Sequence, residues 1–141
     1  MNNGIISIFT NGTELSADVK TLLTRKLINR GYTVMSEYSG EATLLICIGG
    51  DGAFLETIHK CDFPGTPIVG INTGHLGFFQ EVLPEDFDKF ICDYEKGDYS
   101  LQKLNTVQCT VTTSDGVINS HTGLNEITIT GRKSYSVHFD I

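Results

Sequence analysis

The sequence predicts an α/β protein with an open, mostly parallel sheet and flanking helices, followed by the beginning of an antiparallel all-β region. In the first half of the chain, β-favouring segments alternate with helical ones. Segments 43–48 and 68–71 are apolar throughout, which is typical of parallel strands buried on both faces. From Tyr99 onward no helical period is present. We therefore expect an α/β nucleotide-binding domain over 1–98 and the start of a β-rich substrate-binding domain over 99–141.

The first expected elements are a strand and a helix. Ile5–Thr10 is a short β-rich run that ends at the turn signal Asn11-Gly12. Thr13 or Ser16 is suited to cap the helix that follows, and Gly31 is suited to end it. The helical spacing predicts one apolar face, formed by Leu15, Val19, Leu22, Leu23 and Leu27.

Glycine-bearing loops follow both apolar strands. A strand over 32–35 precedes the first of these strands, which runs directly into Gly49-Gly50-Asp51-Gly52 (GGDG), and a helix is expected over 53–61. The second apolar strand runs into a loop over 72–77. Ligands of open α/β sheets bind beyond the carboxyl ends of the strands, so these two loops are expected to form a cleft.

The remaining elements are a helix and several strands. Leu83–Asp86 is expected to open the helix, which ends near Gly97. Val107–Thr113, an Asp115-Gly116 turn and Val117-Ile118 predict a β-hairpin.

Two further strands are expected, over Leu124–Thr130 and over 134–141. The last of them reaches the chain terminus without a closing turn, which would leave an unpaired edge. We therefore expect a fragment of a longer protein, or a second chain that completes the sheet.

The GGDG segment carries the strongest chemical signal. A strand, a glycine-rich turn and a helix in succession present backbone N–H groups to a phosphate. Glycines let a ligand approach the backbone closely, and Asp51 supplies the only functional side chain of the turn. A carboxylate in an anion-binding turn indicates that this side chain accepts a proton or binds a metal ion. The alternative is a turn aspartate that bonds its own backbone.

Three blocks in this order resemble the NAD kinase family: Gly49–Gly52, Gly70–Phe78 and Leu124–Ile127. The GGDG block alone also occurs in lipid kinases and phosphofructokinases, but the three blocks together are specific. The resemblance covers nearly the whole chain, as the N-terminal domain and the start of the C-terminal β domain. It implies ATP-dependent phosphorylation of the 2′-hydroxyl of the adenosine ribose of NAD, with the divalent cation Mg²⁺ as cofactor.

The resemblance also implies roles for single residues. Asp51 would be the catalytic base and a substrate contact, and Gly52 would lie close to the ligand. Phe78 would contact the substrate, while Asn125 and Glu126 would bind NAD. Neighbours on a strand point to opposite faces, so both would reach one ligand only near a strand end or bulge. The alternative for this pair is an ordinary polar surface.

A second set of residues is expected to support the two loops. Its members are Gly49, Gly50, Asn72, Gly74 and His75. His75 has no partner at metal-ligand spacing, so no metal-binding residue is assigned. One or both of Phe78 and Phe79 could enter the core instead, and for Phe79 we expect this.

The sequence departs from the family pattern at three points. Ala53 stands where the family usually has a threonine, and Glu56 stands where a basic residue is frequent. The further β domain and its second glycine-rich segment are absent from this sequence. The alternatives to NAD kinase activity are therefore a lipid kinase of the GGDG type and a non-catalytic NAD-binding fragment.

Composition restricts the partners. A net charge of −7 argues against broad binding to nucleic acid or to anionic membranes, whereas local nucleotide binding remains compatible with it. The four cysteines form no CxxC pair, and Cys47 is expected to be a small core residue. No signal peptide or membrane span is indicated. We expect a cytoplasmic protein that binds NAD and ATP and forms a homo-oligomer at full length.

Overall fold

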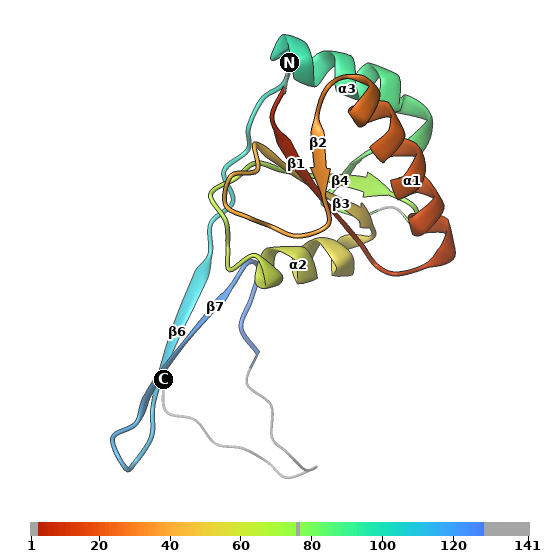
Figure 1. The fold of residues 1–141 in the computed structure, drawn as a ribbon. Helices are drawn as coiled ribbons and strands as arrows, with labels where there is room; N and C mark the ends of the chain where they lie inside the picture. The colour runs from red at the N-terminus through yellow and green to blue at the C-terminus, as the bar shows by residue number, and fades with distance from the viewer. Residues whose placement is uncertain (1–2, 76, 129–141) are drawn as a thin grey trace. The chain divides into compact units, whose positions relative to one another are not determined.

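The structure is a computed structural model that describes residues 3–75 and 77–128. The chain divides after Leu101 into two compact units (Figure 1). The elements of the first unit are β1 (Ile5–Thr10), α1 (Glu14–Asn29), β2 (Thr33–Met35), β3 (Leu44–Gly49), α2 (Asp51–Lys60), β4 (Ile68–Asn72), β5 (Gln80–Val82), the 3₁₀ helix η1 (Pro84–Asp86) and α3 (Phe87–Lys96).

The first unit contains a parallel sheet with strand order β2-β1-β3-β4-β5. The chain proceeds from β1 to one edge and then from β3 to the other, so the order reverses between β1 and β3. This is the order of flavodoxin-like folds, in which ligands bind at the carboxyl ends of the strands beside the reversal. The predicted fold class is confirmed, and the GGDG segment follows a strand at this point.

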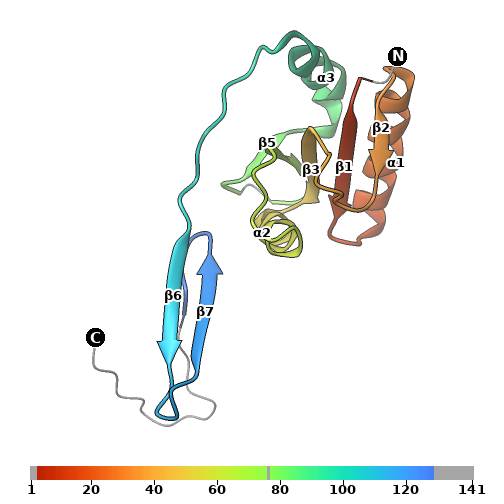
Figure 2. The same ribbon diagram turned by 60° about the vertical axis from the view of Figure 1, so that its left-hand side comes forward.

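Helices cover both faces of the sheet (Figure 2). The larger apolar cluster joins β1, β3 and β4 to α1 and α3, and the smaller lies on the α2 face. Every residue of β3 is buried, as its apolar sequence predicted. The largest fully buried side chains include Ile6, Ile8, Leu23, Leu45, Ile46, Ile48, Ile71 and Phe87.

Helix α1 begins and ends as predicted, but its buried face differs from the predicted one. Thr13 caps it by accepting a hydrogen bond from the Ser16 N–H, and Gly31 follows it with φ of 84°. Leu15 and Leu22 were expected in the apolar face and are instead exposed. Ser16 is buried in their place, because its hydroxyl hydrogen-bonds the Thr73 hydroxyl of the β4 loop at 2.8 Å.

Helix α2 begins two residues earlier than the sequence predicted. Gly50 is its N-cap, so Asp51 and Gly52 lie in its first turn. The expected free-standing Gly49–Gly52 turn is therefore wrong in detail, because its second half is helical. This moves the Asp51 carboxylate onto a rigid element.

Strand β5 was not predicted. Parallel neighbours usually need a crossover of roughly a dozen residues or more, often a helix. Here only residues 73–79 connect β4 to β5, and Gln80 pairs beside Gly70. A β-carbon on Gly70 would lie 2.3 Å from the carbonyl oxygen of Phe79, so glycine permits this close return.

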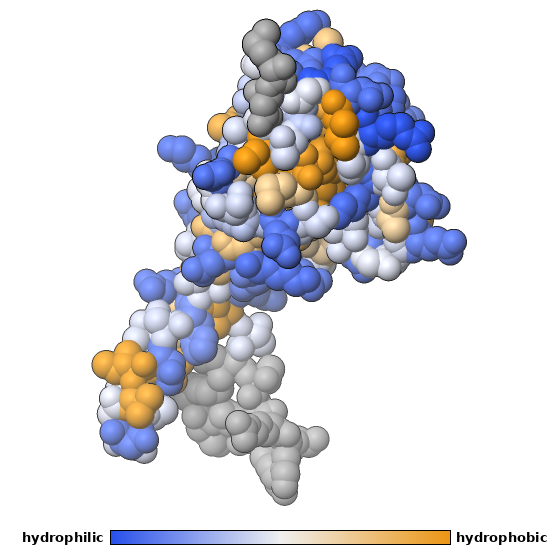
Figure 3. Space-filling model, viewed as in Figure 1, coloured by the Kyte–Doolittle hydropathy of each residue, from blue (hydrophilic) through white to orange (hydrophobic). Residues whose placement is uncertain are grey.

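The second unit contains a hairpin of β6 (Val107–Thr112) and β7 (Ile118–Gly123). Its turn is as predicted: Gly116 has φ of 84°, and the Thr113 and Val117 backbones close it with a 2.9 Å hydrogen bond. Exposed apolar side chains are visible at the turn end of the hairpin (Figure 3), and Ile118 is among the exposed residues.

The predicted strand Leu124–Thr130 is wrong over 124–128, where the chain is not in a strand. The chain leaves the ladder at Gly123 and turns sharply: a β-carbon there would lie 2.6 Å from the Glu126 carbonyl oxygen. The rest of this prediction, and the predicted strand 134–141, lie outside the described residues.

No helix in the described part of the chain is long and apolar enough to cross a membrane.

Candidate active site

The Asp51 carboxylate is hydrogen-bonded to the loop that follows β4. Its Oδ2 accepts from the Phe78 N–H at 2.9 Å, and its Oδ1 accepts from the Phe79 N–H at 3.0 Å. The side chain lies at the start of α2 but does not cap that helix. The alternative of a turn aspartate that bonds only its own backbone is therefore wrong.

Gly77 lies against this carboxylate. A β-carbon at Gly77 would lie 2.3 Å from Asp51 Oδ1 and 2.8 Å from Oδ2. No side chain fits there unless the carboxylate or the loop moves. The absence of a side chain at Gly77 thus permits the close approach of Asp51 to this loop.

The start of the loop is held by its own contacts. Asn72 Oδ1 accepts from the Gly74 N–H at 2.9 Å, which closes an Asx turn. The Thr73 N–H donates to the Gly49 carbonyl at 3.3 Å, while its hydroxyl meets Ser16. Gly74 and His75 are exposed, as a supporting loop on the surface allows.

The loop after β1 also reaches this edge of the sheet. Gly49 has φ of 152°, and a β-carbon on it would lie 2.9 Å from Ala53 Cβ and 3.2 Å from Asn11 Cβ. The Asn11 N–H donates to the Ile48 carbonyl at 3.1 Å. Sequence reasoning missed Asn11 as a site neighbour, because Asn-Gly was interpreted only as a turn. Its place after a strand beside the reversal point was the available signal.

The two phenylalanines of the loop differ in their surroundings. Phe79 stacks on Phe54 of α2 with ring centroids 4.8 Å apart and planes 4° apart, but it is half-buried at the edge of the sheet and does not enter the core as expected. Phe78 is 94% exposed. A solvent-exposed ring beside Asp51 offers a face on which a base can stack.

The first turn of α2 also offers backbone donors. The first N–H groups of a helix have no partner within it, and no side chain caps this one. The positive end of the helix dipole and these donors favour an anion at this position. Gly52 is exposed in the same turn, with no atom within 4 Å of the place of a β-carbon.

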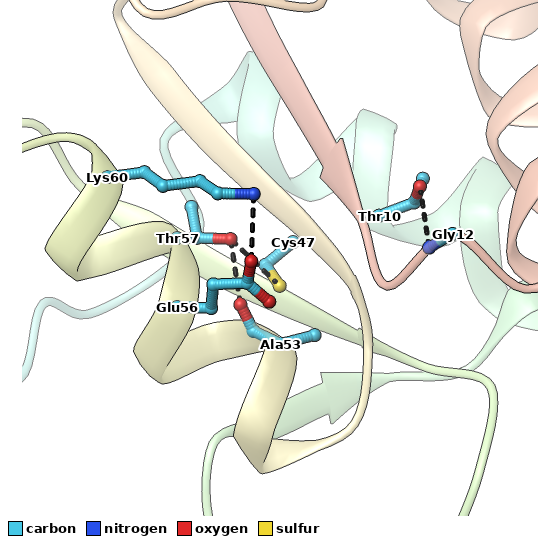
Figure 4. A network of polar contacts seen from close by, with 7 residues as sticks. All are labelled: Thr10, Gly12, Cys47, Ala53, Glu56, Thr57 and Lys60. Atoms are coloured by element: carbon cyan, nitrogen blue, oxygen red, sulfur yellow. Dashed lines mark hydrogen bonds and ion pairs between the residues drawn. The ribbon is translucent and has the colours of Figure 1, made fainter.

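Ala53 and Glu56, the two residues that differ from the family pattern, both lie on α2 and make contacts common in helices (Figure 4). The Ala53 carbonyl accepts from the Thr57 hydroxyl at 2.8 Å, and this hydroxyl also lies 3.4 Å from Cys47 Sγ. Glu56 forms an exposed ion pair with Lys60 at 2.8 Å. Cys47 is fully buried, as expected of a core residue, and burial raises the pKa of its thiol.

Asn125 and Glu126 belong to the second unit. Both are exposed and lie just after β7, outside any strand. Neighbours within a strand point to opposite faces of the sheet, but these two residues are not in a strand, so this restriction does not keep them from contacting one ligand. They lie in a separate unit from Asp51, and their roles stay predictions.

Within residues 3–75 and 77–128, no group of three or more His, Cys, Asp or Glu side chains could hold a metal ion. His75 is exposed and joins no such group among these residues.

A cavity of about 400 Å³ in the first unit lies away from Asp51. It is lined by residues at the beginnings of β3 and β4, such as Leu44 and Ile68, and by Phe90 and Tyr94 of α3. The candidate site is thus a polar edge built by loops, and the apolar cavity is separate from it.

Comparison with known proteins matches residues 7–99 to the family described as the ATP-NAD kinase N-terminal domain. The chain belongs to the NAD kinase family. The match lies within the first unit and includes Asp51 and Phe78.

Relatives extend the likeness over the whole chain. The NAD kinase of Finegoldia magna is 36% identical over 99% of this chain and 52% of its own length. That of Bacteroides fragilis is 35% identical over 79% of this chain and 38% of its own. The chain thus spans about half, or less, of the NAD kinases it matches.

Solved structures share the fold. Yeast NADH kinase complexed with NADH has a TM-score of 0.69 at 13% identity, over 85% of this chain and 46% of the other. An Archaeoglobus fulgidus NAD kinase in complex with ATP has a TM-score of 0.55 at 20% identity, over 74% and 42%.

Proposed function

We propose that this chain belongs to an ATP-dependent NAD kinase, which transfers the γ-phosphate of ATP to the 2′-hydroxyl of the adenosine ribose of NAD. The observation that carries the proposal is the Asp51 carboxylate, fixed at the carboxyl edge of the sheet beside the uncapped N-terminus of α2. A proton acceptor beside an anion-binding helix start suits phosphoryl transfer to a hydroxyl.

The transfer depends mainly on position and charge. Asp51 orients the ribose hydroxyl and accepts its proton as the oxygen attacks the γ-phosphorus. Each carboxylate oxygen has two lone pairs and uses one on the loop, so acceptor capacity remains. The N–H groups at Gly52 and its neighbours face the phosphates, and Phe78 stacks on the adenine. Asn125 and Glu126 bind hydroxyl or amide groups of NAD.

A divalent cation, Mg²⁺, completes the proposed reaction. When bound with the nucleotide, it would supply positive charge that neutralises the transferring phosphate. Since no metal cluster exists among the described side chains, the nucleotide phosphates supply most of its ligands. A cytoplasmic location and assembly of the full-length protein into a homo-oligomer belong to the same proposal.

A non-catalytic NAD-binding module is the second candidate. One observation favours it: the chain spans about half the length of its NAD kinase relatives. Residues beyond this half could be needed for turnover, whereas Phe78, Asn125 and Glu126 would still contact NAD. Lipid kinase activity is disfavoured, since the similar proteins named here are NAD and NADH kinases.

A substrate panel separates these candidates. The chain is incubated with ATP and Mg²⁺ and with NAD⁺, a diacylglycerol or a sphingoid base, and each phosphorylated product is quantified. The proposal predicts NADP⁺ alone. Calorimetric binding of NAD⁺ without any product indicates the binding module, and a phosphorylated lipid contradicts the proposal.

A further inference from the structure

We propose that Asp51 has a second role, as the clamp that holds residues 77–79 on α2 and so presents Phe78. The inference rests on the proposed function for the use of Phe78, but the clamp itself is a property of the ligand-free chain. It makes Asp51 a positioning residue as well as the proposed base, and it makes Gly77 part of the same device.

The first step is the pairing of both carboxylate oxygens. The N–H groups of two consecutive residues, Phe78 and Phe79, each meet a different oxygen of Asp51 at 2.9 and 3.0 Å. Hydrogen bonds to a charged acceptor are roughly twice as strong as neutral ones. The start of the loop is held by the contacts of Asn72 and Thr73, whereas Phe78 and Phe79 lie at its other end, before β5. A two-point bond to a helix therefore determines where this end of the loop lies.

The second step is the space at Gly77. Its backbone does not need the left-handed region, since no such φ occurs there, so the requirement is one of volume. A methyl group would stand 2.3 Å from Asp51 Oδ1, well inside contact distance. Glycine here lets the following two N–H groups reach the carboxylate.

The third step is that the rings of Phe78 and Phe79 have different surroundings. Phe54 lies one helical turn after Asp51, and Phe79 stacks on it. The loop is thus fixed to α2 by a carboxylate and by a ring. Phe78, between these anchors, is left 94% exposed. Because the Phe78 backbone is already held before a nucleotide arrives, less backbone entropy is lost when the ring stacks on a base.

The clamp has a consequence for mutagenesis. Replacing Asp51 removes more than a base: Asp51→Asn leaves one oxygen acceptor and turns an amide NH₂ toward a backbone N–H. Such a variant weakens NAD binding as well as turnover. Gly77→Ala keeps the Asp51 carboxylate in the chain but forces the carboxylate and the loop apart, so its KM for NAD rises while a proton acceptor is still present.

Amide hydrogen exchange followed by NMR tests the clamp without any nucleotide. The samples are the whole chain as wild type, Asp51→Asn, Gly77→Ala and a control, Glu56→Gln, which removes an exposed carboxylate from the same helix. Exchange at the Phe78 and Phe79 amides is expected to accelerate about 10- to 100-fold in the first two variants, as loss of a charged hydrogen bond implies. The control is expected to match the wild type.

Amides of the buried strand β3 report whether each variant is folded. With these unchanged, equal protection of Phe78 and Phe79 in wild type and Asp51→Asn overturns the clamp. If Asp51→Asn does not fold, Gly77→Ala is compared with the wild type instead. Equal protection of the Phe78 and Phe79 amides in these two samples then overturns the clamp. Since no NAD or ATP is present, failure of the proposed kinase activity leaves this result unaffected, and failure of the clamp leaves the activity assay unaffected.

Discussion

The α/β unit and the hairpin unit hold their candidate site residues in different ways. In the first, every residue of β3 is buried, and Asp51 follows this strand on a helix with two hydrogen bonds of its own. In the second, β7 is exposed except at Gly123, and Asn125 and Glu126 follow it in an exposed segment. The comparison teaches that the proposed phosphoryl-transfer half rests on a packed core. The described part of the proposed substrate-binding half rests mainly on backbone pairing, and a two-stranded hairpin alone is marginal.

The largest expected effect tests the difference in burial. Ile46→Ala in β3 removes a fully buried side chain and should lower the unfolding free energy by about 2–5 kcal/mol, mostly through the cavity left behind. Ile118→Ala in β7 truncates the same residue type at 67% exposure and should cost within about 0.5 kcal/mol. Urea unfolding of both variants provides the measurement. Equal costs would remove the distinction between the units.

The next effect sharpens the account of the site edge. Gly49→Ala introduces a β-carbon 2.9 Å from Ala53 Cβ at φ of 152°, and strain of this kind costs about 1–3 kcal/mol. Gly52→Ala, in the same motif, meets no atom within 4 Å and serves as the matched control for stability. Thermal unfolding should show a lower Tm for the first variant and little change for the second. A tolerated Gly49→Ala would show that the loops are not packed as described.

The sequence predicted those elements that depend on local residue patterns and missed those that depend on contacts between distant residues. Ile5–Thr10 and the Asp115-Gly116 turn were predicted because apolar runs and turn residues are local signals. Strand β5 was missed because residues 73–79 return along the sheet without a helix. The strand predicted from Leu124 failed because the chain turns at Gly123, which alternation of apolar residues does not reveal.

The candidate site shows the same division. The GGDG motif predicted Asp51 as the functional carboxylate, and the family match includes it. The contacts of Asp51 with Phe78 and Phe79 were not predictable, since they join residues 27 and 28 positions apart. Ser16 was expected only as a cap, yet it is buried against Thr73 because tertiary packing, rather than helical periodicity, selects the buried stripe.

A smaller effect concerns the interior of α2. Thr57→Val keeps the shape of a buried side chain and removes its hydrogen bonds to the Ala53 carbonyl and Cys47 Sγ, at a cost of about 1 kcal/mol. Thr21 makes the same type of backward bond, to the Ala17 carbonyl, on the exposed side of α1. Thr21→Val should therefore cost less in chemical denaturation. An equal or larger cost at Thr21 would contradict the role of burial.

The smallest expected effect is on alkaline stability. Burial raises the pKa of the Cys47 thiol above its ordinary value of 9.0, so the unfolded chain ionises first as the pH rises. Stability from this group is complete below pH 9 and decreases as the pH rises through the folded pKa. Unfolding free energies above pH 9 should therefore fall less steeply in Cys47→Ala than in the wild type. Parallel slopes would show that Cys47 does not contribute.

The most direct test of the central claim is NADP⁺ formation by the chain with NAD⁺, ATP and Mg²⁺, compared between Asp51→Asn and Glu56→Gln. Both variants remove one negative charge from α2, but only the first removes the carboxylate that contacts Phe78 and Phe79. The account predicts turnover in the wild type and in Glu56→Gln, and a loss of at least about 100-fold in Asp51→Asn. Turnover of Asp51→Asn at the wild-type rate would contradict it.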